Sequence, residues 1–139
     1  MDMERIKTTL IRHEGLELKP YRCTSDKLTI GVGRNLDDRG ITHTTAMQML
    51  DEDIELSIED LRRNLSWFDE MPEPVQEALI NLTFNMGIVR LMQFRKTIAF
   101  LRDREWDKAA TEMLDSRYAT QVGRRADEVA DMIRSAADA

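Results

Sequence analysis

Three residues near the N-terminus could together perform acid–base or nucleophilic chemistry. Eight residues separate Glu14 from Cys23 and five separate Cys23 from Thr29, and Cys23 is the only cysteine in the chain. A carboxyl group can act as a general acid, as glycoside cleavage requires at the leaving oxygen. A thiol can serve as a nucleophile, as a base or to position water, and a threonine hydroxyl can hold water. Each residue also has an ordinary explanation. Glu14 could form a salt bridge at the end of a helix, Cys23 could be a small apolar residue in the hairpin, and Thr29 could simply favour a strand.

The elements around these residues predict a helix followed by a hairpin. Residues 3–14 have the apolar spacing of an amphipathic helix, and Gly15 can end it. Because Glu14 lies one turn beyond Leu10, we expect it on the apolar side and partly desolvated. Residues 20–33 predict a short β-hairpin, and its two final glycines, at 31 and 33, permit close backbone approach. Residues 37–40 predict a turn.

The rest of the chain predicts helices. Apolar residues at steps of three and four predict a long helix that runs from Thr42 or Thr44 to about residue 66. Pro74 suits the start of a buried helix that ends at Gly87. Shorter helices are expected near Phe94–Arg102, Glu105–Leu114 and Arg124–Ala137. The predicted class is therefore α+β and predominantly α, with the β-structure confined to the N-terminal third.

Composition excludes several classes of function. The length of 139 residues suits one domain, and the net charge of −6 argues against general nucleic-acid binding. Two histidines and one cysteine are too few to suggest a metal cluster, so we expect no metal and no cofactor. The N-terminus lacks an apolar signal core and no stretch is long enough to span a membrane, so we expect folding in a reducing cytoplasm and no stable membrane insertion.

Three stretches, in order along the chain, resemble the phage lysozymes, the muramidase-type endolysins. The first runs from His13 to Tyr21 and continues from Leu28 to Gly33. The second is Ala78–Gly87, and the third runs from Arg104 through Ser116–Tyr118 to Ala126. The resemblance implies a lysozyme-like two-lobed fold over residues 1–139. Its parts would be an N-terminal helix and β lobe at about 1–41, a connecting helix at about 42–66 and a helical lobe at about 67–139.

The resemblance also implies a reaction, the hydrolysis of the β-1,4 bond between N-acetylmuramic acid and N-acetylglucosamine in peptidoglycan. Glu14 matches the family's general acid, and Thr29 matches the threonine that helps to place the attacking water. Cys23 stands where many members carry Asp, although the family pattern admits Cys. A neutral thiol cannot stabilise a cationic transition state as a carboxylate does, but a thiolate or a hydrogen bond to water can still help. Asp26, in the hairpin turn, is the rival carboxylate.

Supporting residues follow from the same resemblance. Arg125 matches an arginine that pairs with the catalytic glutamate, and Asn85 falls where a cleft-lining amide is usual. Leu28 and Gly31 are expected to bind substrate or to support the site. Arg34 replaces a histidine of close relatives and would pair with Asp53 on the long helix.

The expected partner is the glycan strand of bacterial peptidoglycan. The family implies a monomeric, bacteriolytic enzyme that accumulates in the host cytoplasm before lysis, is released with the help of a holin and acts on periplasmic peptidoglycan. Two alternatives stay open. One is a lytic transglycosylase, and the other is a non-catalytic peptidoglycan-binding module of a virion, which the change to cysteine and the acidic balance would suit.

Overall fold

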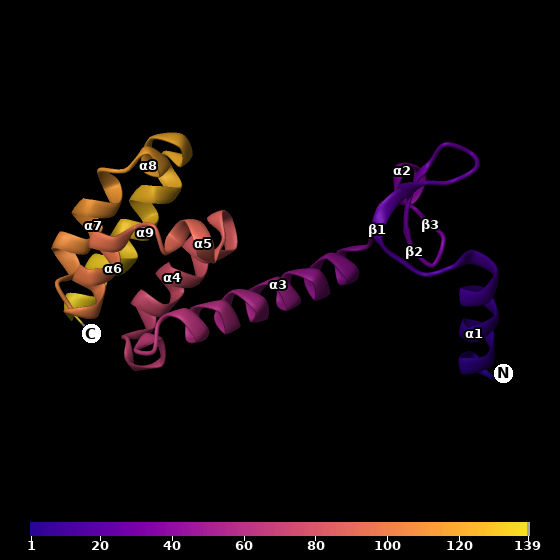
Figure 1. Ribbon diagram of the computed structural model, residues 1–139, viewed down its shortest axis with the longest axis horizontal. Coiled ribbons are helices and arrows are strands. Elements are labelled where there is room, and N and C mark those ends of the chain that lie inside the picture. The colour runs from indigo at the N-terminus through magenta and orange to yellow at the C-terminus, as the bar shows by residue number, and fades with distance from the viewer. Residues whose placement is uncertain (139) are drawn as a thin grey trace. The chain divides into compact units, whose positions relative to one another are not determined.

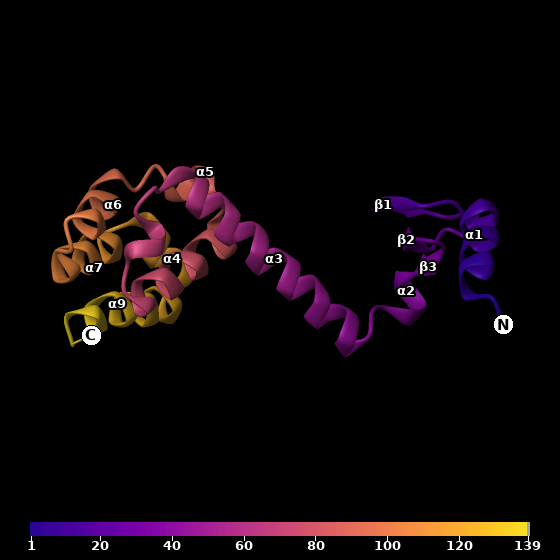
Figure 2. The same ribbon diagram turned by 90° about the horizontal axis from the view of Figure 1, so that it is seen from below.

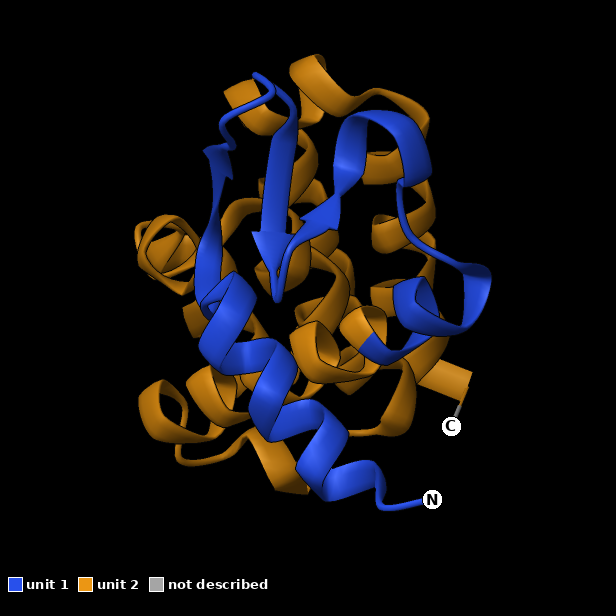
Figure 3. Ribbon diagram, turned by 90° about the vertical axis from the view of Figure 1, so that its right-hand side faces the viewer, with its two compact units in different colours: residues 1–48 blue, residues 49–139 orange. Residues whose placement is uncertain are grey.

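The computed structural model describes residues 1–138 and contains two compact units, residues 1–48 and residues 49–139. Figure 1 labels the elements, and Figure 3 colours the two units. One small antiparallel sheet lies in the first unit, and helices make up most of the rest. The predicted class, α+β and predominantly α, is confirmed. The division of a single domain into two lobes and a connecting helix stays a prediction.

Unit 1 holds a helix, a three-stranded sheet and a one-turn helix. Its elements are α1 (Met3–Glu14), β1 (Glu17–Arg22), β2 (Leu28–Gly31), β3 (Arg34–Asn35) and α2 (Leu36–Arg39). The Asp2 side chain caps α1 by accepting from the Arg5 amide, and the Gly15 amide closes its end on the Ile11 carbonyl. Both predicted ends of this helix are therefore found.

The sheet has the order β1-β2-β3, with antiparallel neighbours. Thr29 pairs with Tyr21 on one side and with Asn35 on the other. The hairpin predicted over residues 20–33 is confirmed, and β3 extends it by a strand that the sequence did not predict. Thr29 thus lies on the central strand.

Residues 37–39 belong to the short helix α2, and Gly40 caps its end, where the sequence predicted a turn. The Asn35 side chain accepts from the Asp38 amide at 3.0 Å and so starts α2, and Gly40 ends it. Asp, Asn and Gly residues are common both in turns and at the ends of helices. Here the cap that Asn35 provides favours the helix over the turn.

The long helix α3 spans His43–Asn64, and the boundary between the units falls within it. The Thr42 hydroxyl accepts from the Thr45 amide at 3.1 Å, so Thr42 caps the helix as predicted. Nothing in residues 1–138 combines the helix length and the apolar composition that crossing a membrane requires.

Unit 2 contains the remaining helices. They are η1 (Phe68–Glu70), α4 (Glu73–Met86), α5 (Ile88–Leu91), α6 (Arg95–Arg102), α7 (Trp106–Leu114), α8 (Arg117–Val122), α9 (Arg124–Ser135) and η2 (Ala136–Asp138). The helices α6, α7 and α9 lie in the three predicted regions. The short α5 and α8 were not predicted, because four to six residues show too little apolar periodicity.

The hydrophobic core lies in unit 2. The helix α9 packs against α4 and α7, and α6 packs against α7 (Figures 1 and 2). The helix α4 contributes the largest set of buried residues among the described helices, namely Val75, Ala78, Leu79, Leu82 and Thr83. This agrees with the prediction of a buried helix after Pro74.

Candidate active site

Glu14 is the last residue of α1, and its carboxyl group lies against the backbone of Gly33. A Cβ built on Gly33 would stand 2.8 Å from Glu14 Oε2. The contact brings the end of α1 to the turn that joins β2 and β3. Glu14 itself is exposed, and α1 buries none of its residues. Within unit 1 the small sheet leaves this side of α1 uncovered, and the expectation that Glu14 is partly desolvated stays a prediction.

Only one of the two hairpin glycines makes the predicted close approach. A Cβ on Gly31 would meet nothing within 4 Å, although its φ is +70°. Sequence reasoning placed Gly31 among the site residues and left out Gly33. The Gly31-Val32-Gly33 spacing was the signal for a close approach, but it did not say which glycine faces the acid.

Thr29 is the one buried residue among the 48 of unit 1, with 3% of its surface exposed. Its position on the central strand explains the burial. Its hydroxyl donates to the Lys27 carbonyl at 2.8 Å. The buried polar group is thus satisfied by the turn that precedes its own strand.

Cys23 begins that turn, and the residue as a whole is half-buried. The Cys23 amide donates to the Lys27 carbonyl at 3.0 Å, and the Asp26 amide donates to the Cys23 carbonyl at 2.8 Å. Hydrogen bonds from the backbone amide of Lys27, the backbone amide of Ser25 and the Thr29 hydroxyl stabilise the thiolate and lower the pKa of Cys23. The hairpin therefore brings Cys23 and Thr29 together, as their spacing predicted.

Asp37 ties the hairpin to α2. Its Oδ2 accepts from the Leu28 amide at 2.7 Å and lies 3.6 Å from Arg22 Nη1. Lys27 and Asp38 add an exposed ion pair at 3.3 Å beside it. Sequence reasoning missed Asp37, whose only signal was an acidic pair directly after the hairpin. Leu28 was predicted to support the site, and its amide is what Asp37 binds.

Asp26, the rival carboxylate, lies at the exposed tip of the turn. Its φ is +59°, a conformation that Asp tolerates better than most residues. Its carbonyl accepts from Arg22 at 3.3 Å. These observations give Asp26 a part in the shape of the turn.

Two predicted residues lie in unit 2. Arg125 Nε donates to Asn81 Oδ1 at 2.9 Å, and Asn85 Oδ1 accepts from the Tyr118 hydroxyl at 2.8 Å. Burial raises the pKa of Tyr118, and the positive charges of Arg125 and Arg90 partly offset it. Arg125 also lines a mostly apolar hollow of about 340 Å³ with Leu50, Ile54, Glu77, Ile80, Asn81, Phe84 and Met132.

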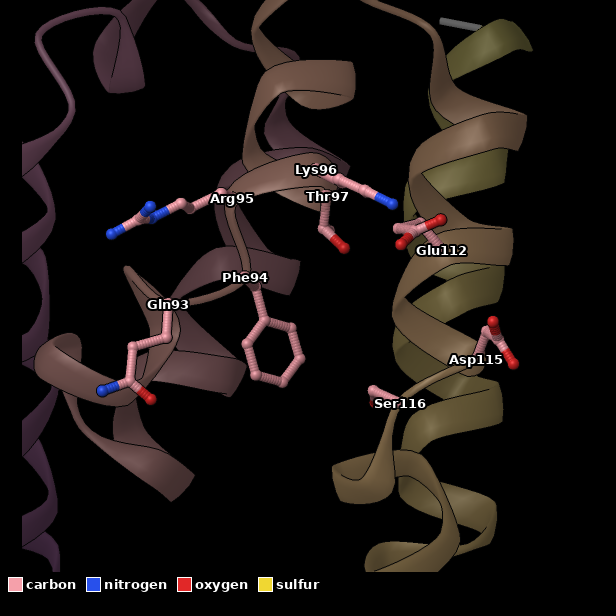
Figure 4. A pocket seen from close by; sticks show the side chains of 8 residues that line it. All are labelled: Gln93, Phe94, Arg95, Lys96, Thr97, Glu112, Asp115 and Ser116. Carbon is pink, nitrogen blue, oxygen red and sulfur yellow. The ribbon is translucent and has the colours of Figure 1, made fainter.

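Unit 2 has a second hollow, of about 360 Å³, where α6 begins and α7 ends (Figure 4). Charges of both signs line it. Lys96 extends toward Glu112, whereas Arg95 points away from that side chain. None of the residues predicted for the site lies here.

The two predicted ion pairs that would join the units stay predictions. Glu14 and Arg34 lie in unit 1, whereas their predicted partners, Arg125 and Asp53, lie in unit 2. Arg34 Nη1 donates to the Gly40 carbonyl at 3.3 Å within unit 1. Across residues 1–138, no His, Cys, Asp or Glu side chains gather in threes in a way that could hold a metal ion.

A small antiparallel sheet, a long helix and a helical unit, with a glutamate at the end of the first helix, define a lysozyme-like α+β protein. The family model for phage lysozyme matches residues 11–133, and the chain belongs to this family. It is also similar to two proteins of Dictyostelium discoideum. "Probable T4-type lysozyme 1" is 24% identical over 94% of each chain, and "Probable T4-type lysozyme 2" is 23% identical over 89% of this chain and 90% of its own. The family implies a glycoside hydrolase that cleaves peptidoglycan.

Proposed function

We propose that the protein is a muramidase that hydrolyses the β-1,4 bond between N-acetylmuramic acid and N-acetylglucosamine. Glu14 is the general acid, and Cys23 and Thr29 place and activate the water. The observation that carries this proposal is the arrangement of unit 1. The Thr29 hydroxyl and two backbone amides of the turn before β2 lower the pKa of the Cys23 thiol. Glu14 lies against the turn at the other end of β2.

The chemistry follows from these groups. Glu14 gives its proton to the glycosidic oxygen as the bond from that oxygen to the anomeric carbon breaks. Water attacks the anomeric carbon and passes its proton to the Cys23 thiolate. Because the pKa of Cys23 is lowered, more of the thiol is present as thiolate than in an ordinary cysteine. A thiolate carries the negative charge that the family's usual aspartate supplies, which a neutral thiol would lack.

Residues of unit 2 would hold the glycan strand. The hydrogen bond from Tyr118 occupies Asn85 Oδ1, so the amide N–H groups of Asn85 stay available to sugar hydroxyls. Asn85 is exposed, as a ligand-binding amide must be. Arg125 is held in place by Asn81 and borders an apolar hollow, so it combines a fixed charge with an apolar surface.

Replacing the acid tests the proposal. The variant Glu14→Gln keeps the shape of the side chain but removes its proton, so release of reducing ends from purified sacculi should fall by about 10²–10⁴-fold. Glu17→Gln is the matched control, since Glu17 is an exposed glutamate three residues away on β1. Equal activity of Glu14→Gln and the parent would remove Glu14 from the reaction.

The role of Cys23 and the two rival functions are separated by the products. Cys23→Ser should lose most of the activity, because serine offers no anion near neutral pH, and Cys23→Asp should keep it. Mass analysis of the fragments should show hydrated reducing ends. Anhydromuramic ends would indicate a lytic transglycosylase, and binding to sacculi without any cleavage would indicate a binding module.

A further inference from the structure

We propose that Gly33 is a positioning residue for the general acid, because its missing side chain sets where the carboxyl group of Glu14 lies. This inference rests on the proposed function and adds to it a residue that does no chemistry itself. It concerns the contact between the end of α1 and the turn after β2, both of which belong to unit 1.

The contact is too close for any side chain at residue 33. A Cβ there would lie 2.8 Å from Oε2, 3.2 Å from Cδ and 3.3 Å from Cγ of Glu14. Ordinary contacts between such atoms begin at about 3.4–4 Å, so all three atoms occupy space that a methyl group would take. The carboxyl group would have to move by roughly 0.5 Å or more.

The carboxyl group of Glu14 would move more easily than the backbone of the turn. Gly33 lies in the tight connection between two paired strands, where Ile30 pairs with Arg34 across the turn. Glu14 is exposed at the end of its helix, and within unit 1 no side chain donates a hydrogen bond to its carboxylate. A methyl group at residue 33 therefore displaces the carboxyl group and leaves the sheet in place.

This contact distinguishes Gly33 from the other glycines of the chain. All six have positive φ, but a Cβ on any of the other five would meet nothing within 4 Å. Strain from an L-residue at positive φ is thus common to all of them, whereas contact with the acid belongs to Gly33 alone. Gly40, with φ of +60° at the end of α2, is a matched control because it lies in the same unit.

The displacement should act on the chemical step. A general acid works only within hydrogen-bonding reach of the leaving oxygen, and a misplacement of about 1 Å can cost about 100-fold. The rest of the substrate contacts are untouched. We therefore expect kcat to fall by about 10–100-fold in Gly33→Ala, with KM within about twofold of the parent.

The experiment compares Gly33→Ala, Gly40→Ala and Glu14→Gln. Initial rates on a soluble, uncrosslinked glycan strand give kcat and KM, and circular dichroism gives Tm and the folded fraction at the assay temperature. Both alanine variants should lose similar stability, since both place an L-residue at positive φ. Of the two alanine variants, only Gly33→Ala should lose kcat. Gly33→Asn is a second variant, because Asn accepts positive φ more readily yet still carries a Cβ toward Glu14.

The outcomes separate this inference from the function on which it rests. If Glu14→Gln stays active, the assignment of the acid fails. If Glu14→Gln is inactive while folded Gly33→Ala and Gly33→Asn keep the kcat of Gly40→Ala, the acid stands and the positioning role of Gly33 is overturned. Loss confined to KM would also overturn it, since that pattern indicates a binding role.

Discussion

At the scale of single residues, the Thr29 hydroxyl has two acceptors and one proton. It donates to the Lys27 carbonyl at 2.8 Å, and it also stabilises the Cys23 thiolate. A hydroxyl can rotate, so it can turn from the carbonyl to the sulfur when the thiol ionises. Thr29 thereby couples the shape of the turn to the charge of the cysteine.

Removing this hydroxyl should change the reactivity of Cys23. Thr29→Val takes away a donor to the thiolate, and losing a stabilising donor raises the pKa of Cys23 toward its ordinary value of 9.0. The thiolate fraction near pH 7 then falls, and alkylation by iodoacetamide slows there while its pH midpoint moves upward. Rates measured from pH 6 to 10 would show the shift. Thr29→Ser keeps the hydroxyl and should keep the midpoint, and an unchanged midpoint in Thr29→Val would refute the hydrogen bond.

The sequence could predict that Cys23 and Thr29 meet, but it could not rank Gly33 above Gly31. Cys23 directly follows β1 and Thr29 is the second residue of β2, so pairing of the two strands brings both residues to the same end of the hairpin. The path of the turn after β2 decides which glycine faces the acid, and no local pattern encodes that path. Within unit 1 Glu14 is exposed, because an apolar helix side is buried only where enough surface exists to cover it.

At the scale of elements, Asp37 joins α2 to the strand that bears Thr29. The Leu28 amide on β2 donates to Asp37 Oδ2 at 2.7 Å, and Arg22 on β1 adds a longer ion pair to the same carboxylate. Within unit 1, five of the six residues of β1 are exposed, so polar contacts of this kind help to hold the hairpin. The helix α2 thus stabilises the position of the strands that carry the proposed catalytic residues.

Replacing Asp37 should loosen the start of β2. Asp37→Ala leaves the Leu28 amide without its partner, at a cost of about 1 kcal/mol because water can replace part of the bond at this exposed position. Amide exchange measured by NMR should then be about fivefold faster at Leu28. Asp38→Ala is the control, since Asp38 lies on the same helix as Asp37. This variant removes side-chain contacts with Lys27 and Asn35 and leaves the hydrogen bond of the Leu28 amide intact. Equal exchange rates at Leu28 in both variants would contradict the stabilising role of Asp37.

At the scale of the whole molecule, stability and chemistry are divided between the units. Every buried hydrophobic residue in the described chain lies between Leu61 and Ala136, within unit 2, whereas the proposed catalytic residues lie in unit 1. Burial of apolar surface is the main favourable term in folding. Unit 2 should therefore supply most of the free energy of unfolding.

A matched pair of leucine truncations tests this division. Leu79 in α4 is fully buried, and Leu79→Ala should lower the free energy of unfolding by about 2–5 kcal/mol through lost contacts and a cavity. Leu18 in β1 is 82% exposed, and Leu18→Ala should change it by less than about 0.5 kcal/mol. Urea denaturation followed by far-ultraviolet circular dichroism measures both. A cost for Leu18→Ala as large as that for Leu79→Ala would mean that the hairpin unit contributes a core of its own to the stability of the protein.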